Sequence, residues 1–189
     1  MILGITGGTG CGKTTLLKEI EARGGLVLDC DAVYHELLTR DCALLNAIEN
    51  RFHGVVVDKK LERKKLGAIV FADEQALQDL NAITHGAIKA EIVRRLSENP
   101  PLAAIDAIAL FEGGLAHLCD TTVAITAPRA ERVARLMKRD GISAQYAENR
   151  INAQKSESWF REMCEHTLHN DGTQEEFRRK CSEFLDSIL

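Results

Sequence analysis

The chain contains 189 residues, of which 28% are charged and 45% hydrophobic, and its 24 basic and 28 acidic residues leave a net charge of −4. This composition is typical of one globular domain with a sizeable core, and it excludes a protein that binds nucleic acid through a generally basic surface. No apolar run approaches the ~20 residues that a membrane-spanning helix needs. We therefore expect a cytoplasmic protein, a monomer or weak homo-oligomer, with neither nucleic acid nor a membrane as partner.

A strand and a glycine-rich loop come first. Residues 1–6, MILGIT, are typical of a buried strand, and residues 7–14, GGTGCGKT, match G-x-x-x-x-G-K-[ST] in full before a helix predicted over 13–23. Such a loop points successive backbone N–H groups into one concavity, although a glycine turn that only packs strand against helix is the alternative. Lys13 is expected to bridge the β- and γ-phosphates of ATP, and the Thr14 hydroxyl to bind Mg²⁺. The expected nucleotide-binding residues are Gly8, Thr9, Gly10, Cys11, Gly12, Lys13, Thr14 and Thr15.

Six cysteines are scattered along the chain without a CxxC pair, which argues against a zinc site and against a disulfide framework. One of them, Cys11, stands inside the loop beside Lys13 and near a helix N-terminus, and both features favour a thiolate. We expect Cys11 to be the most reactive thiol and MgATP to protect it. The alternative is that cysteine is simply small enough to fit.

Two aspartates lie at the end of the second predicted strand, residues 26–30 (LVLDC). Strand alternation would point Asp29 and Asp31 the same way, at the carboxyl edge of a parallel sheet, where α/β folds bind ligands. A carboxylate there can accept the proton of an attacking hydroxyl, so Asp31 is the candidate catalytic base. The alternative is that these side chains cap the helix predicted over 32–38, and Asp29 could instead support Mg²⁺ through water.

The middle of the chain is predicted to be a helical insertion, about residues 57–100, large enough to cover a substrate. Helical periodicity extends over 42–51 and 74–98, with Asp73 as an N-cap, and the sequence NPP should end the second helix. Asp106 then lies within the third predicted strand, 103–110, where it could orient Mg²⁺ or satisfy a neighbouring amide. Glu112 follows that strand and is open to the same two interpretations.

A basic segment follows the fourth predicted strand, residues 121–126. Helices are expected over 129–139 and 143–153, and Gly141 between them permits a hinge. Guanidinium groups suit the neutralisation of charge on a transferring phosphoryl group, so we expect these two helices to form a lid. The basic residues are Arg132, Arg135, Lys138 and Arg139 on the first helix and Arg150 on the second; the alternative is a solvated helix with ion pairs to Glu131 or Glu148.

A possible fifth strand at 166–169 and a helix over 174–188 complete the predicted elements, with Ser143 and Thr173 as further N-caps. Trp159 and Phe160 are expected only to pack. The alternation of strands and helices predicts an α/β, three-layer P-loop NTPase fold with a parallel sheet of about five strands. We expect a single kinase domain with a core at about 1–56, 101–130 and 165–189, the insertion at 57–100 and the lid at about 131–164.

The loop alone does not choose among nucleotide-hydrolysing classes. A guanine-reading NKxD segment is absent from the sequence, which argues against a GTPase, and motor ATPases generally need a longer chain. Phosphoryl transfer to a small molecule is therefore favoured. A nucleoside or nucleotide kinase of similar fold and a P-loop nucleotide-binding regulator remain the alternatives.

Several segments together resemble the dephospho-coenzyme A kinase family almost end to end. They are TGGTGCGKTT, LDCDAVYHELL, LERKKLGAIVFADEQALQDLNAITHGAI, LFEGGL, RLMKRDGIS, RINAQKS and HNDGT. The resemblance implies phosphorylation of the ribose 3′-hydroxyl of dephospho-CoA by ATP and Mg²⁺, the last step of CoA synthesis. It also implies that Asp31 is the base and that the insertion binds the CoA portion. The arginine-bearing helices would close over ATP, with Arg139, which stands beside Asp140 in the family-like segment RDG, as the catalytic arginine.

The chain departs from the family pattern at a few positions. His35 stands where the family usually has an arginine, Gly86 stands where it has a proline, and IAL replaces PLL before Phe111. His35 matters because loss of a fixed positive charge beside the acceptor could weaken substrate binding or shift that role to another residue. The resemblance places His85 in the CoA site as well, and a histidine packed between helices is the alternative.

Overall fold

A computed structural model describes residues 1–40 and 42–189 of the chain. Their contacts divide the chain into two compact units. The first contains Met1–Leu28, Pro100–Phe111 and Leu115–Leu189, and the second contains Asp29–Asn99 and Glu112–Gly114. The insertion expected at about 57–100 falls almost entirely in the second unit, which also contains residues 29–56.

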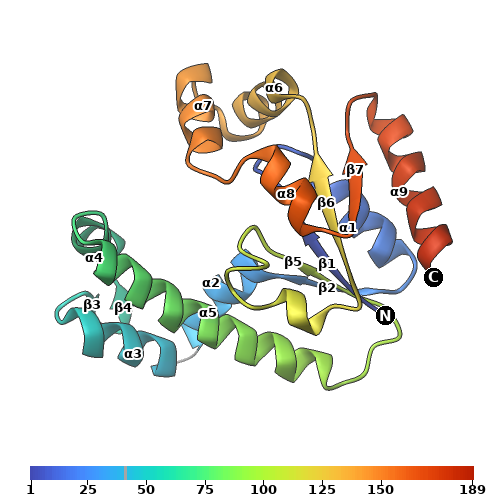
Figure 1. The fold of residues 1–189 in the computed structure, drawn as a ribbon. Coiled ribbons are helices and arrows are strands. Elements are labelled where there is room, and N and C mark those ends of the chain that lie inside the picture. The colour runs from blue at the N-terminus through green and yellow to red at the C-terminus, as the bar shows by residue number, and fades with distance from the viewer. Residues whose placement is uncertain (41) are drawn as a thin grey trace. The chain divides into compact units, whose positions relative to one another are not determined.

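A five-stranded sheet forms the centre of the first unit (Figure 1). Its strands are β1 (Ile2–Thr6), β2 (Leu26–Asp29), β5 (Ala103–Asp106), β6 (Thr121–Thr126) and β7 (His166–His169). They lie in the order β2-β5-β1-β6-β7; β1 pairs in parallel with β5 and with β6, and β6 pairs in parallel with β7. The sheet of five strands predicted from the sequence is therefore confirmed.

Helices cover both faces of this sheet. α1 (Lys13–Ala22) and α9 (Gln174–Ile188) pack on each other, and α8 (Glu157–Met163) contacts β6 (Figure 1). The short 3-10 helix η1 (Ala116–Leu118) precedes β6. In the described part of the chain, no helix combines the length and apolar character that crossing a membrane requires.

Two further helices, α6 (Arg129–Asp140) and α7 (Ala144–Asn152), form a pair of their own. A small apolar cluster joins them, in which Leu136, Ala147 and Ile151 are buried. The α6–α7 pair is therefore held together by apolar packing of its own.

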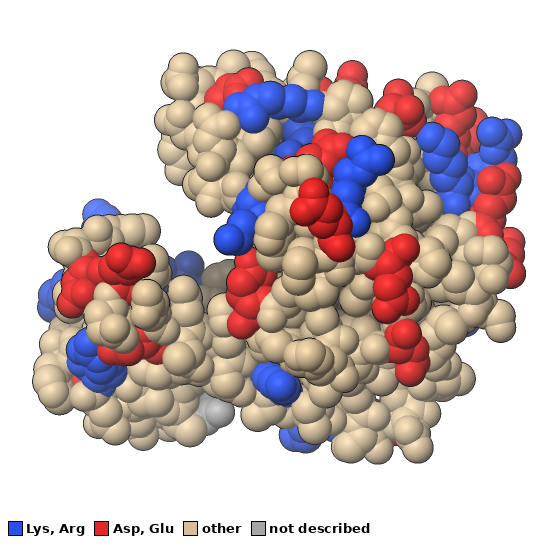
Figure 2. Space-filling view, in the orientation of Figure 1, with Lys and Arg blue, Asp and Glu red and all other residues tan. Residues whose placement is uncertain are grey.

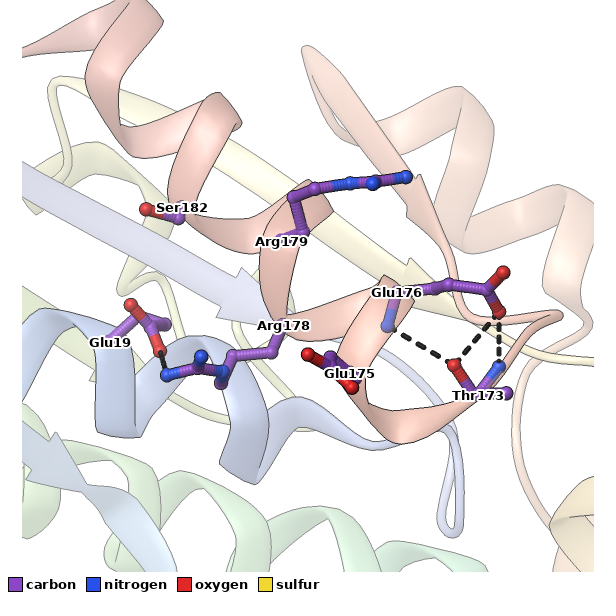
Figure 3. A pocket seen from close by; sticks show the side chains of 7 residues that line it. All are labelled: Glu19, Thr173, Glu175, Glu176, Arg178, Arg179 and Ser182. Carbon is purple, nitrogen blue, oxygen red and sulfur yellow. Dashed lines mark hydrogen bonds and ion pairs between the residues drawn. The ribbon is translucent and has the colours of Figure 1, made fainter.

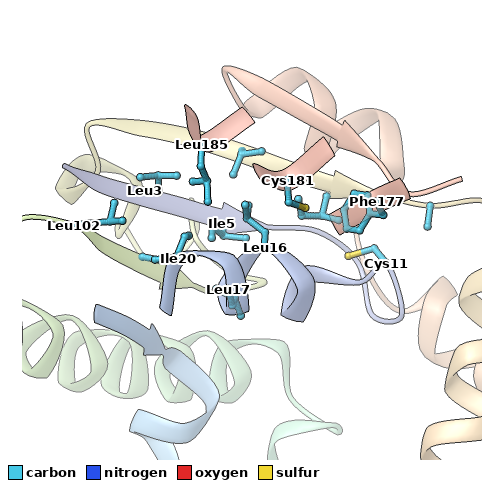
Figure 4. Close-up of a cluster of buried hydrophobic side chains, with 14 residues drawn as sticks. Leu3, Ile5, Cys11, Leu16, Leu17, Ile20, Leu102, Phe177, Cys181 and Leu185 are labelled. Carbon is cyan, nitrogen blue, oxygen red and sulfur yellow. The ribbon is translucent and has the colours of Figure 1, made fainter. Parts of the chain in front are cut away.

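The main core of the first unit lies between the sheet and the helices α1 and α9 (Figure 4). Leu3 and Ile5 alternate along β1 and meet Leu16 and Ile20 of α1 and Phe177 of α9, all of them at most 1% exposed. These positions follow the periods of two on a strand and three to four on a helix, which is why the sequence predicted the elements. Burial of each such side chain contributes roughly 1.5–3 kcal/mol.

In its described residues, the second unit has four helices and a short hairpin. The helices are α2 (Cys30–Arg40), α3 (Cys42–Phe52), α4 (Arg63–Val70) and α5 (Glu74–Leu96), and the hairpin pairs β3 (Val56–Val57) with β4 (Lys60–Leu61). Leu44, Ile48 and Phe52 of α3 and Leu66 of α4 belong to its buried cluster. This unit therefore has an apolar core of its own.

A network of ion pairs ties α2 to α5 within the second unit. The guanidinium group of Arg95 lies 2.5 Å from Glu36 on α2 and 2.7 Å from Glu91 on its own helix, and Arg94 also pairs with Glu91. The hydrogen bonds from Arg94 and Arg95 lower the pKa of Glu91 to about 2. Because α2 also carries Asp31 and His35, this network helps to hold the helix on which two predicted site residues lie.

The N-caps expected from the sequence are confirmed. The side chains of Asp73, Ser143 and Thr173 each accept a backbone hydrogen bond at the start of a helix, and Thr173 forms a full capping box with Glu176. Two strands end earlier than expected, at Asp29 rather than residue 30 and at Asp106 rather than residue 110. The second difference moves Asp106 from the middle of a strand to its carboxyl end.

Besides the 3-10 helix η1, four elements were not expected from the sequence. The strands β3 and β4 have two residues each, too few for a pattern of alternation, and their turn uses Asp58 and Lys59 at φ 49° and 61° in place of the usual Asn-Gly. The helices α4 and α8 have eight and seven residues, which is about two turns each. Helical periodicity is hard to recognise over so short a length.

Candidate active site

The phosphate loop joins β1 to α1 and has the backbone that its glycines predict. Gly7 has φ 141°, and a Cβ there would lie 2.2 Å from the carbonyl oxygen of Ile125, so no other residue fits that position. Gly12, the N-cap of α1, supplies no side-chain cap to the first turn of the helix. No side chain of Gly12 therefore stands between that turn and a ligand, although the N–H group of Thr15 already donates to the carbonyl oxygen of Gly12 at 3.1 Å. An open helix N-terminus of this kind suits the binding of an anion.

Lys13 folds back over this loop. Its Nζ donates to the carbonyl oxygen of Gly7 at 3.3 Å and lies 3.7 Å from Oδ1 of Asp106. Both side chains are mostly buried, at 15% and 14% exposure, so their attraction is screened less than that of a surface pair. Because β5 ends at Asp106, the carboxylate stands beside the loop at the end of the neighbouring strand.

The expectation that the surroundings of Cys11 favour a thiolate is wrong. The residue is 2% exposed, and its side chain belongs to the main core with Leu16 and Phe177 (Figure 4). Burial raises the pKa of the thiol, and the opposing effect of the Lys13 charge is smaller. The backbone of Cys11 remains in the loop, where its carbonyl oxygen accepts from Nδ2 of the buried Asn170 at 2.9 Å. Cysteine at this position thus serves packing.

Two of the basic residues on α6 already contact the loop. Nε of Arg132 donates to the carbonyl oxygen of Thr9 at 2.9 Å, and Nη1 of Arg135 donates to those of Gly10 and Cys11 at 3.3 and 3.4 Å. Arg135 also lies 3.9 Å from Glu131, one of the ion pairs that the sequence left open. The structure therefore brings Arg132 and Arg135, rather than Arg139, to the loop.

Arg139 lies at the far end of α6. It donates to both carboxylate oxygens of Asp140, at 2.6 and 2.9 Å, and Arg150 donates to Oδ2 of the same residue at 2.6 Å. These hydrogen bonds lower the pKa of Asp140 to about 2, and the bond from Arg139 has the largest effect. Glu148 pairs with Arg129 instead of Arg150. Arg139, at 60% side-chain exposure, is thus held by a carboxylate near the turn at Gly141.

Asp29 and Asp31 do not share one strand, because α2 begins at Cys30. Oδ1 of Asp29 accepts from the N–H groups of Asp31 and Ala32, at 2.8 and 3.1 Å, so Asp29 caps α2. The expectation that alternation points both aspartates the same way is wrong. Asp31 lies exposed in the first turn of the helix, where its carboxylate does not serve as the cap.

His35 has a partner that the sequence did not indicate. Nη2 of Arg63, at the start of α4, lies 3.1 Å from Nδ1 of His35, and the histidine ring also lies 5.8 Å from that of Tyr34. An arginine can only donate, so Nδ1 acts as the acceptor and the proton of a neutral ring resides on Nε2. A positive charge therefore does accompany His35. Only the position of Arg63 in LERKKLG could have suggested it.

The remaining expected residues are more scattered. His85 lies half-buried on α5, and Glu112 is exposed within the short segment 112–114 of the second unit. Phe160 is buried, and Trp159 packs edge to face against both Phe160 and Phe111. The two aromatic residues on α8 are therefore packing residues, as expected.

The surface of α1 and α9 carries a cavity of about 550 Å³ (Figure 3). Several of its polar groups pair with one another: Arg178 lies 3.8 Å from Glu19, and Thr173 and Glu176 form the capping box. Figure 2 shows basic and acidic side chains interspersed over the face of α9 that is in view. None of the residues that line this cavity belongs to the phosphate loop.

Comparison with known proteins decides the family. The model of dephospho-CoA kinases matches residues 1–176. The chain belongs to the dephospho-CoA kinase family. A dephospho-CoA kinase of Anaeromyxobacter dehalogenans is 35% identical over 193 residues, which cover 99% of this chain and 92% of that one. The chain is therefore a kinase, and its family performs the final step of CoA biosynthesis.

Solved structures agree with this assignment to the dephospho-CoA kinases. A dephospho-CoA kinase from Campylobacter jejuni aligns with a TM-score of 0.69 and 25% identity, over 99% of this chain and 96% of that one. A protein of Thermus thermophilus aligns with a TM-score of 0.83 and 30% identity, over 100% and 98%. The predicted P-loop kinase fold is confirmed.

Proposed function

We propose that this dephospho-CoA kinase binds MgATP in the loop at residues 7–15 and transfers the γ-phosphoryl group to the ribose 3′-hydroxyl of dephospho-CoA. The observation that carries the proposal is the convergence of Lys13, Arg132 and Arg135 on one glycine-rich loop. Three cations around uncapped backbone N–H groups form a site for a polyphosphate, and few other ligands would satisfy them.

On the donor side, Lys13 would exchange the Gly7 carbonyl oxygen for phosphate oxygens. An ammonium group held at 3.3 Å from a neutral carbonyl can move to a more negative acceptor with little rearrangement. Its charge would then meet the charge that develops between the β- and γ-phosphates during transfer. Preorganised stabilisation of this kind is commonly the largest single contribution to such catalysis.

The residues beside the loop fit a magnesium ion. Thr14 offers a hydroxyl in the first turn of α1, and Asp106 offers a carboxylate beside Lys13, and oxygen ligands are those that Mg²⁺ prefers. The described residues contain no group of three acidic, histidine or cysteine side chains around a common point, which suits an ion held mainly by phosphates and water. When bound, Mg²⁺ neutralises charge on the β- and γ-phosphoryl oxygens.

On the acceptor side, Asp31 would take the proton of the attacking hydroxyl. Asp29 supports this division of roles, because it already supplies the cap of α2 and leaves the carboxylate of Asp31 for chemistry. We further propose that the His35–Arg63 pair meets the anionic part of dephospho-CoA and that His85 contributes to the same site. Arg63 would supply the charge that the family usually places at position 35.

The helix pair α6–α7 would act as the lid over ATP. Arg139 and Arg150 are held by Asp140, and phosphate oxygens are acceptors of the same kind. When the lid closes, Arg139 would exchange Asp140 for the γ-phosphate and so contribute only in the closed state. We place this reaction in the cytoplasm.

A coupled assay of ADP release tests the function directly. Dephospho-CoA, adenosine, CMP and no acceptor are compared at saturating MgATP, and the product is identified by mass spectrometry. We expect turnover with dephospho-CoA alone and a product heavier by one phosphoryl group. Turnover with adenosine or CMP would favour a nucleoside or nucleotide kinase, and equal turnover without acceptor would favour a nucleotide-hydrolysing regulator.

A further inference from the structure

Two side chains from distant parts of the chain hold one residue of the phosphate loop. The N–H group of Thr9 donates to Oε1 of Gln154 at 2.8 Å, and its carbonyl oxygen accepts from Nε of Arg132 at 2.9 Å. Nη2 of Arg132 also reaches Oε1 of Gln154, at 3.5 Å. Thr9 and Arg132 are each 8% exposed, so water competes little for these bonds. Together the three groups close a ring of hydrogen bonds.

The packing of Arg132 on the loop is equally close. A Cβ at Gly8 would lie 2.3 Å from Nη2 of Arg132, and a Cβ at Gly10 would lie 2.8 Å from its backbone oxygen. These two glycines therefore make room for the arginine as well as for a phosphate. Any larger residue at position 8 would displace the guanidinium group from Thr9.

Gln154 and Arg132 come from opposite ends of the helix pair α6–α7. Arg132 lies in the first turn of α6, while Gln154 follows the end of α7, where its N–H group donates to the carbonyl oxygen of Ile151 at 3.2 Å. Both ends of the pair are thus fixed to the same residue of the loop. The turn at Gly141, with Asp140 and its arginines, lies between them along the chain.

The partners of Arg132 also determine what its charge can do. They are a backbone carbonyl and a carboxamide, which are both neutral and leave its positive charge in place beside the loop. A carboxylate at position 154 would accept the same hydrogen bonds more strongly but would cancel that charge. Glutamine is the side chain that provides the acceptor without the negative charge.

We propose that Gln154 is a positioning residue for phosphoryl transfer, which fixes Thr9 and Arg132 in the loop while it leaves the charge of Arg132 available to the nucleotide. The proposal rests on the loop being the ATP site. Gln154 acts through Arg132 and the loop backbone, and this role requires no contact between Gln154 and the reacting atoms.

Two substitutions separate the hydrogen bond from the charge. Gln154→Leu removes the acceptor at similar volume and leaves the buried N–H group of Thr9 unsatisfied, so kcat/KM for ATP should fall about 10- to 100-fold. Gln154→Glu keeps the acceptor and pairs it with Arg132, so the melting temperature should stay at or above that of the wild type. KM for ATP should nevertheless rise at least about tenfold, because the charge of Arg132 is neutralised. A purely structural role would not separate stability from KM in this way.

Gln145 provides the matched control. It is an exposed glutamine on α7 that donates to Asn149, and its Leu and Glu variants should leave KM and kcat/KM for ATP unchanged. Wild-type KM for ATP in Gln154→Glu overturns the proposal, and that variant decides alone if Gln154→Leu fails to fold. Lys13→Ala in the same assay distinguishes failure of the loop assignment from failure of the role of Gln154. If Lys13→Ala keeps its activity, the loop is not the ATP site. If Lys13→Ala loses activity while the Gln154 variants behave as the wild type, only the role of Gln154 is overturned.

Discussion

Asp29 and Asp31 are two positions apart, yet the cap at α2 and the proposed mechanism give them opposite roles that substitution can separate. Asp29→Ala removes an oxygen that accepts from the N–H groups of Asp31 and Ala32 at 2.8 and 3.1 Å. Loss of such a cap costs about 1 kcal/mol, which lowers the melting temperature of a chain of this size by about 2–4 °C. Asp29→Asn keeps a side-chain oxygen and should recover most of this loss.

Asp31→Asn should have the reverse effect. The amide preserves the shape of the side chain but cannot accept the proton of the attacking hydroxyl, and general-base catalysis is worth about 100- to 10,000-fold in kcat. That loss corresponds to about 2.7–5.5 kcal/mol in the activation barrier. Stability should change little, because a carboxylate in the first turn of α2 contributes only about 0.3–1 kcal/mol through the helix dipole.

Both quantities can be measured on the same four proteins, the wild type, Asp29→Ala, Asp29→Asn and Asp31→Asn. Thermal unfolding gives the stability, and the coupled assay of ADP release with saturating ATP and dephospho-CoA gives kcat. The reasoning is refuted if Asp31→Asn keeps kcat within a few-fold of the wild type. It is equally refuted if Asp29→Asn loses as much activity as Asp31→Asn, since the base would then be Asp29.

Further substitutions test the donor side and the lid. Lys13→Ala should lower kcat about 100- to 1000-fold with an unchanged circular dichroism spectrum; undiminished turnover by the folded variant would remove the loop assignment. Arg139→Ala should lower kcat without lowering the melting temperature, and an equal loss of both would indicate a structural ion pair. Its partner Asp140 has a pKa lowered to about 2, so their pairing should be fully present above the unfolded pKa and be lost only as pH falls through about 2, which carboxyl NMR shifts can follow. Cys11 should react with a thiol reagent more slowly than the exposed Cys42, measured by mass-spectrometric mapping, and faster labelling of Cys11 would contradict its burial.

The elements that could be predicted from the sequence are those whose pattern is both long and local. The strands β1, β2, β5 and β6 contain apolar runs, and the loop at 7–14 is fixed by the spacing of its glycines and lysine. The N-cap at Thr173 was equally visible, because a cap and its helix are adjacent in sequence. Each of these features depends on interactions within a few residues.

The features that could not be predicted depend on where a chain turns or on which distant residue approaches. Alternation was extended beyond Asp29, whereas α2 begins at Cys30, so the sequence did not show that Asp29 rather than Asp31 caps this helix. The orientation of Cys11 depends on the core beneath the loop, to which Phe177 contributes from the far end of the chain. The approach of Gln154 to Thr9 spans 145 positions, and no local pattern carries that information.

Because α6 is attached to the loop near its start, at Arg132, a rotation about that point moves the other end of the helix furthest. Arg139 lies seven residues further along, which is about 10 Å at 1.5 Å per residue. A rotation of only ~10° about the attached end would therefore carry the guanidinium end of α6 through about 2 Å, the difference between a hydrogen bond and no contact. A small displacement of Arg132 with the loop at Thr9 would thus become a larger displacement at Arg139, and the length of α6 between the two residues sets the ratio.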